Sequence, residues 1–205
     1  MTKKLGYIIF VSLCIIVGLY PALYFMIDTN FGILKTKSNL LLGNGLWNIS
    51  FYAHISLGGL ALLIGWTQFI EKFRKNNKNL HGNLFTVYLI SVIFSGFSAL
   101  YLAYHATGGM VSTIGFSILA FIWIFSTFRA FLEIKNGSKR KYQIFMIYSY
   151  AACFSAVTLR FWQPILMSFF DSYIMAYRVL AWLSWVPNII VAYYMTKPYR
   201  LSKYR

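Results

Sequence analysis

The chain has 205 residues, of which 59% are hydrophobic and 11% are charged, and its formal net charge is +15. About a quarter of the residues in a soluble domain are charged. This composition therefore excludes an ordinary soluble enzyme and indicates an integral membrane protein. A basic excess is also typical of nucleic-acid-binding proteins, but here the charges gather between apolar runs, which argues against a nucleic-acid partner.

Six apolar runs are long enough to cross a bilayer as helices, which takes about 20 residues each. In chain order, these predicted spans are residues 6–26, 47–70, 84–106, 110–131, 143–162 and 173–195. Backbone polar groups in lipid must bond within their own segment, so the predicted fold class is all-α, a bundle of six transmembrane helices. The spans fill most of the chain, which predicts a single transmembrane domain over residues 1–205.

The basic residues predict how the helices are oriented. All lysines and arginines except Lys35, Lys37, Arg160 and Arg178 lie near one membrane side: before the first span, around the second and fourth connections, or after the last span. By the positive-inside rule, both termini are then cytoplasmic. Abundant lysine, asparagine and isoleucine favour a bacterial source, and hence the cytoplasmic (inner) membrane.

Some local features refine this picture. In the first connection, the apolar-rich stretch from Phe31 to Leu42 predicts a short helix along the membrane interface. Pro164 is expected to help end the fifth span, and Pro187 to kink the sixth. Cys14 and Cys153 both fall within spans, where we interpret them as small buried apolar side chains.

Three spans carry stripes of small or polar residues at helical spacing. The stripes are Ser50, His54, Gly58, Ala61, Gly65 and Gln68 in the second span, Ser91, Ser95, Ser98 and His105 in the third, and Ser149, Cys153, Ala156 and Arg160 in the fifth. Small residues let membrane helices approach closely, so we expect these faces to meet. Leu102, a large apolar member of the third-span stripe, would keep a neighbour further away near His105.

Four ionisable side chains within the spans form the candidate site: His54, His105, Arg160 and Arg178. Such groups usually face a bundle interior, where they are functional candidates. The first three fall near the same membrane face, and Arg178 lies about 8 Å below the start of its helix on a face with two tryptophans. Alternatively, either arginine could snorkel to the headgroups, His105 could be an interfacial residue, and His54 could only join two helices by a hydrogen bond.

One hypothesis for this site is haem-linked electron transfer. Histidines on facing transmembrane helices often hold haem iron, so His54 and His105 are the predicted metal ligands if a haem is bound. Arg160 and Arg178 would then neutralise haem propionates or a quinone oxygen. The chain has three histidines, which allow at most one bis-histidine b-type haem. The predicted depths of His54 and His105 differ by about 10 Å, and His81 is expected in a connection, solvated or facing headgroups.

Two other hypotheses remain open. The protein could be a carrier or binding protein for a quinone, a lipid or an anionic ligand, with the same four residues lining a pocket. It could also be a non-enzymatic accessory protein that works with other membrane subunits, in which these residues only brace helices. The sequence lacks a serine-nucleophile motif and a carboxylate cluster, which argues against a hydrolase; otherwise it leaves open whether the protein is an enzyme.

Taken together, residues between about 54 and 190 resemble a bacterial family of uncharacterised, predicted multi-pass membrane proteins. The residues that carry the resemblance are His54-x-x-x-Gly58-x-x-Ala61, Gly65-x-x-Gln68, His81 with Tyr88, Gly108-Gly109, Gly115-Phe116, Trp123, Met146, Ser149-Tyr150-Ala151, Ala156 to Arg160, and Trp185-x-x-Asn188. The chain departs from the family pattern at Phe85, Tyr142 and Tyr148, where the family has a glycine, a histidine and a basic residue.

The resemblance implies a fold, an orientation and a set of polar positions, and no established activity. The missing histidine at Tyr142 could have partnered His81. The likeness to membrane cytochromes b is architectural only.

Overall fold

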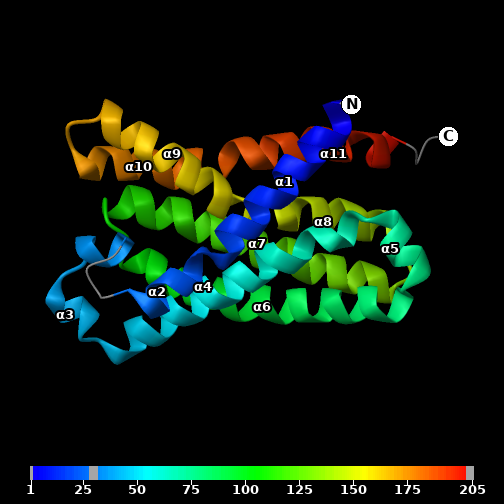
Figure 1. The fold of residues 1–205 in the computed structure, drawn as a ribbon, viewed down its shortest axis with the longest axis horizontal. Coiled ribbons are helices and arrows are strands. Elements are labelled where there is room, and N and C mark those ends of the chain that lie inside the picture. Colours follow the sequence, from blue (N-terminus) through cyan, green and yellow to red (C-terminus); the bar gives the residue numbers. More distant parts are fainter. Residues whose placement is uncertain (1, 28–31, 202–205) are drawn as a thin grey trace. The chain divides into compact units, whose positions relative to one another are not determined.

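All regular structure in the part of the chain that the computed structural model describes, residues 2–27 and 32–201, is helical (Figure 1). Among these described residues, six segments are long and apolar enough to cross a membrane, as predicted. They are Lys4–Met26, Gly45–Phe69, Lys78–Tyr104, Met110–Lys135, Lys139–Phe169 and Tyr173–Tyr199. All six are longer than the predicted spans, mostly because the helices continue past the apolar runs into flanking residues.

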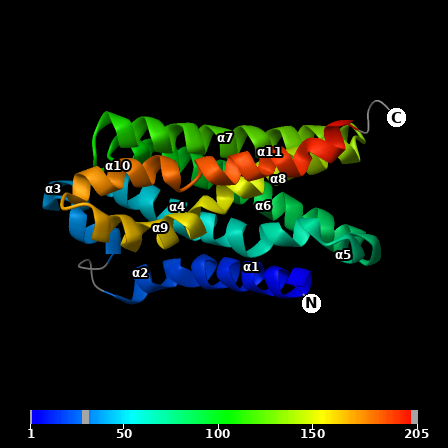
Figure 2. The ribbon, with the colours of Figure 1, turned by 90° about the horizontal axis from the view of Figure 1, so that it is seen from above.

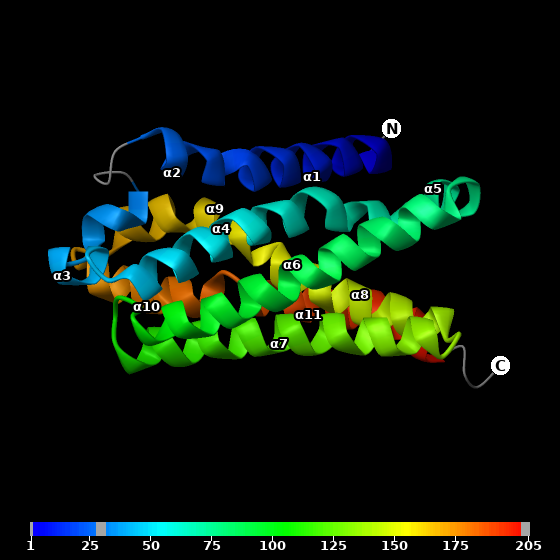
Figure 3. The same ribbon diagram turned by 90° about the horizontal axis from the view of Figure 1, so that it is seen from below.

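The chain divides into two compact units, residues 1–102 and residues 103–205. In the first unit, α1 (Thr2–Leu19) lies alongside α4 (Gly45–Gly65), as Figure 3 shows. The two backbones touch at Gly18 and Gly59: a Cβ added to Gly59 would lie 2.6 Å from the carbonyl oxygen of Gly18. Small residues permit this close approach. The predicted stripe on the second span ran through Gly58 and missed this contact.

Short helices join α1 to α4. They are η1 (Tyr20–Ala22), α2 (Leu23–Met26), η2 (Gly32–Thr36) and α3 (Asn39–Leu42). The expected helix in this connection therefore forms in two pieces, and Phe31, its first predicted residue, lies outside the described residues. An aromatic cluster holds the connection against α4, with Trp47 stacked on Phe51 at 5.2 Å between ring centroids and Tyr24 packed edge-on against Phe51. Partial burial of Lys37, which lies in this connection, lowers the pKa of its ammonium group.

Beyond α4, the chain turns through η3 (Trp66–Phe69) and α5 (Glu71–Asn76) into α6 (Lys78–Tyr104). Lys75 pairs with Glu71 on α5 at 2.8 Å and lowers the pKa of that carboxyl. The third span was expected to begin near residue 84, which left His81 in a connection. That expectation was wrong, because the polar residues from Lys78 onward already form the first turns of α6.

In the second unit, α7 (Met110–Lys135) and α8 (Lys139–Cys153) form an antiparallel pair, visible in Figure 2. Gly137, with φ of +72°, makes the tight turn between them. The hydroxyls of Thr127 and Ser149 meet at 2.6 Å and join the two helices. Near the turn, the buried carboxylate of Glu133 accepts a hydrogen bond from Arg129 at 3.0 Å.

The last two spans are each broken near their middle. The fifth consists of α8 and α9 (Ser155–Phe169), separated at Phe154, and the sixth of α10 (Tyr173–Leu183) and α11 (Val186–Leu201), separated at Ser184 and Trp185. A kink was predicted at Pro187, and the helix is interrupted just before it, at Ser184 and Trp185, with Ser184 still in the helical region of φ and ψ. Pro187 lies in the first turn of α11, where a missing N–H costs no helical bond.

The expectation that Pro164 helps end the fifth span was wrong. Pro164 lies inside α9, which continues to Phe169. Its ring removes one backbone N–H bond to the carbonyl one turn earlier, but membrane helices tolerate such a gap where neighbouring groups satisfy the freed backbone.

Side chains from both breaks are joined by hydrogen bonds, and we call this group, Thr158, Ser184 and Asn188, the break network. The Asn188 amide donates to Thr158 Oγ1 at 3.0 Å and lies 3.3 Å from the Ser184 carbonyl oxygen and 3.4 Å from that of Ala151. The Thr158 hydroxyl also donates to the Ser184 carbonyl. Backbone carbonyls that the breaks release from regular helix are thereby paired, as a buried site requires.

Candidate functional site

His54 lies half-buried on α4 and faces Ser95 of α6. Its Nδ1 is 3.1 Å from the Ser95 carbonyl oxygen and 3.0 Å from Ser95 Oγ, and the Ser95 hydroxyl lies 3.0 Å from the His54 carbonyl oxygen. A proton on Nδ1 lets the ring donate to the Ser95 carbonyl while the serine donates back to His54. In the neutral tautomer that makes these bonds, the lone pair of the ring is on Nε2. The stripes predicted on the second and third spans therefore meet here.

His105 follows the last residue of α6 and is half-buried in the connection to α7. Its ring packs edge-on against Tyr104, with 5.1 Å between the centroids. His54 belongs to the first unit and His105 to the second, and their pairing as metal ligands stays a prediction.

Arg160 lies half-buried on α9 and turns back along its own helix. Its Nη1 donates to the carbonyl oxygen of Ala156, one turn earlier, at 2.9 Å. Both residues belong to the predicted small-residue stripe. The contact satisfies one guanidinium donor with backbone; a role for Arg160 toward a ligand stays a prediction.

Arg178 is held against the start of α7. Its Nε donates to the Gly108 carbonyl oxygen at 2.8 Å, and its Nη1 lies 3.9 Å from the sulfur of Met175. One turn further along α10, Trp182 Nε1 donates to the Val111 carbonyl oxygen at 3.2 Å. Two points of contact thus fix α10 beside the first turn of α7, and Figure 1 shows the two helices starting at the same end.

Glycines allow α10 to pack this closely against α7. A Cβ on Gly115 would lie 2.9 Å from the Ala181 carbonyl oxygen, which is backbone and cannot easily move. Gly108 and Gly109 have φ values of +99° and +68°, which side-chain-bearing residues rarely adopt. We call the group formed by Gly108, Gly109, Ser112 and Arg178 the Arg178 corner.

The Arg178 corner contains a positive charge that forms no ion pair with any acidic residue in the described part of the chain. Within the described ranges, Glu71 pairs with Lys75 and Glu133 with Arg129 and Lys141. Asp171 is exposed in the turn before α10, and no carboxylate described in the chain forms an ion pair with Arg178. The guanidinium stays charged at any physiological pH.

Three features of potential functional interest were not anticipated from the sequence. His81 is only 8% exposed inside α6, and its ring Nε2 has no hydrogen-bond partner among the residues the structure describes. Ser112 is fully buried at the start of α7, and its hydroxyl is likewise unpartnered there. The break network is the third. The pair Gly108-Gly109 before an apolar run could have pointed to the buried Ser112. No sequence pattern predicts that His81 is buried.

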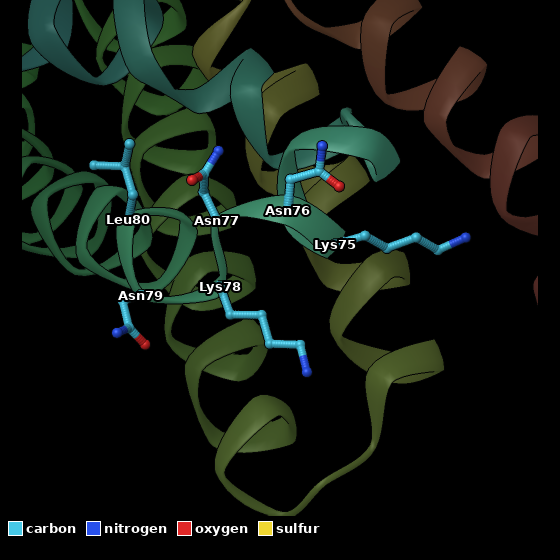
Figure 4. A pocket seen from close by; sticks show the side chains of 6 residues that line it. All are labelled: Lys75, Asn76, Asn77, Lys78, Asn79 and Leu80. Carbon is cyan, nitrogen blue, oxygen red and sulfur yellow. The ribbon is translucent and has the colours of Figure 1, made fainter.

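A surface hollow lies where α5 meets α6 (Figure 4). It is lined by Lys75, Asn76, Asn77, Lys78, Asn79 and Leu80. The side chains point away from one another in the close-up, so this hollow presents no convergent set of polar groups. Across residues 2–27 and 32–201, no group of three or more histidine, cysteine, aspartate or glutamate residues is placed to hold a metal ion.

Residues 51–196 match the family described as "Predicted membrane protein (DUF2306)". The chain belongs to this family. The match includes all four predicted site residues and both helix breaks, and it identifies a multi-pass protein embedded in a lipid bilayer. No curated protein and no solved structure matches the chain. Family membership assigns no reaction, so any function has to be argued from the site.

Proposed function

We propose that this membrane protein is a binding protein or carrier for a small molecule with an anionic or carbonyl head, such as a quinone, a lipid headgroup or an organic anion, held at the Arg178 corner. One observation carries the proposal: a half-buried arginine within a membrane span has a backbone carbonyl as its partner, and no carboxylate among residues 2–27 and 32–201 forms an ion pair with it. Arg178 is about 8 Å along α10 from the start of the span.

The physical cost of this charge supports a ligand. Ionisable side chains in the membrane are expensive and are usually retained for a function. The bond from Nε to Gly108 fixes the orientation of the guanidinium plane, and a guanidinium has five N–H donors. The donors at Nη1 and Nη2 are suited to a ligand oxygen, to which they would make charge-assisted hydrogen bonds.

Replacing Arg178 with glutamine tests this proposal. We expect Arg178→Gln to bind a short-chain quinone analogue, decanoate or decyl phosphate at least tenfold more weakly than the parent protein, because a hydrogen bond to a charged group contributes about 1.5–3 kcal/mol. Titration calorimetry on protein in an uncharged maltoside detergent would measure the dissociation constants. Arg140→Gln, the same change at the start of α8, should leave them unchanged. Equal affinities in Arg178→Gln and the parent would overturn the proposal.

A second candidate function is binding of one b-type haem, with His54 as a ligand and His105 as the predicted partner. The support is the bond between His54 Nδ1 and the Ser95 carbonyl. Metal-ligating histidines usually donate their other ring N–H to a carbonyl or carboxylate, which orients the ligating nitrogen. The same bond serves equally well as a brace between α4 and α6, which is the accessory-protein alternative.

An absorbance spectrum separates haem binding from bracing. If haem is bound, purified protein should show a Soret band that sharpens, with α and β bands, on addition of dithionite, and His54→Ala should lose the bands while staying folded. A featureless spectrum that added haemin does not change would rule out the haem candidate. In that case, His54→Ala should simply lower the unfolding temperature.

We also propose that both termini face the cytoplasm and that the membrane is a bacterial inner membrane. The connection at residues 136–138 is flanked by Lys135 and Lys139, whereas the connection at 105–109 has no lysine or arginine. Cysteines introduced singly at Thr107 and Ser138, with Cys14 and Cys153 replaced by serine, test this orientation. An impermeant maleimide applied to intact spheroplasts should label the first and spare the second; the reverse pattern would refute the orientation.

A further inference from the structure

Ser112 supplies a buried hydroxyl at the Arg178 corner. Its side chain is fully buried, and its Oγ has no hydrogen-bond partner in the described structure. The hydroxyl faces Gly108: a Cβ on Gly108 would lie 2.5 Å from Ser112 Oγ and 3.1 Å from Arg178 Cγ. A buried polar atom without a partner is costly and calls for an explanation, such as a bound group.

The start of α7 adds positive potential at the same point. α7 is 26 residues long, and its first N–H groups have no carbonyl partner within the helix. The Gly109 carbonyl accepts the N–H groups of Ser112 and Thr113, which fixes the first turn. The N-terminus of a long helix carries a partial positive charge and attracts anions.

Arg178 is therefore a cation placed at the positive end of a helix. The bond to the Gly108 carbonyl holds the guanidinium beside this helix end, whose partial charge has the same sign, and no ion pair of the described residues involves Arg178. The two positive charges therefore repel each other. A negatively charged ligand would relieve this repulsion, because both the guanidinium and the helix end attract it. A neutral carbonyl would relieve much less.

Resting on the proposed function, we infer that the ligand of the Arg178 corner is an oxyanion, a carboxylate or a phosphate, that binds between the Arg178 guanidinium and the Ser112 hydroxyl at the N-terminus of α7. An oxyanion has several oxygens, so it accepts from the guanidinium and from the hydroxyl together. A quinone presents one carbonyl oxygen at each end and no net charge. The oxyanion can come from a lipid headgroup or from a free solute.

Ser112→Ala tests the inference with little risk to the fold. The hydroxyl has no hydrogen-bond partner among the described residues, so its removal should leave the unfolding temperature unchanged or slightly higher. In titration calorimetry, Ser112→Ala should bind decanoate and decyl phosphate about tenfold more weakly, with the quinone analogue unaffected. Ser117→Ala, the same change elsewhere on α7, is the matched control and should bind all probes as the parent does.

Acetate and inorganic phosphate separate the two sources of the oxyanion. Binding of these ions as strongly as of decanoate and decyl phosphate supports a free solute, and binding of the alkyl probes alone supports a lipid headgroup. Two results would overturn the inference and leave the proposed function standing. In the first, Ser112→Ala binds the oxyanion probes as tightly as the parent protein does. In the second, only the quinone analogue binds, and its binding depends on Arg178. If no probe binds the parent protein, both fail.

Discussion

Replacing Gly59 with alanine is expected to lower the free energy of unfolding by about 1–3 kcal/mol, the usual cost of forcing extra atoms into a packed contact. The new methyl group would lie 2.6 Å from the backbone oxygen of Gly18 and 3.0 Å from the ring of Pro21. Backbone cannot rotate away as a side chain can, so α1 has to move off α4. Unfolding of the purified protein in detergent, followed by circular dichroism against temperature or denaturant, measures the loss.

Gly45→Ala is the matched control on the same helix. A Cβ at Gly45 meets no other atom within 4 Å. Alanine is also the better helix former, so this variant should be as stable as the parent or more stable by up to about 1 kcal/mol. If the two variants unfold alike, the close contact between α1 and α4 is not as described.

Asn188→Ala is expected to cost a comparable 1–3 kcal/mol, for a different reason. It removes the amide that lies between the Ala151 and Ser184 carbonyls and donates to Thr158. Buried acceptors left unsatisfied cost about that amount. Asn79→Ala, an exposed asparagine in the first turn of α6, should change the stability by less than about 0.5 kcal/mol.

A double-mutant cycle with Thr158→Val shows whether the break network acts as a unit. Partners in one hydrogen-bond network usually show coupling energies above about 0.5 kcal/mol, whereas independent residues add. We therefore expect the double variant Thr158→Val/Asn188→Ala to be less destabilised than the sum of the two single variants. Strict additivity would contradict the idea that the two breaks support each other.

The spans could be predicted because length and hydropathy suffice to define them. Their ends could not, since an apolar run reports the thickness of the hydrocarbon and not where the helix starts. His81 illustrates the difference: four residues into α6, it is buried although it precedes the apolar run. Pro187 marked the break in the sixth span, but the break at Phe154 has no proline or glycine to announce it.

The candidate site was predicted as a set of residues and not as contacts. Arg178 was identified because a charge within a span is rare, yet its partner Gly108 is 70 residues away along the chain. Such a pairing depends on how helices pack, which periodicity within one helix does not encode. For the same reason, the serine partner of His54 was foreseen only as a shared helix face.

The two half-helices of the sixth span have a mechanical consequence. A continuous helix tilts as a rigid rod, so a force at one end reaches the other membrane surface. Here α10, which carries Arg178, joins α11 through only two non-helical residues, while the Ser184 carbonyl at its end is tied to Thr158 on α9. A displacement of α10 is therefore expected to pull on α9 through this bond as well as on α11 through the chain.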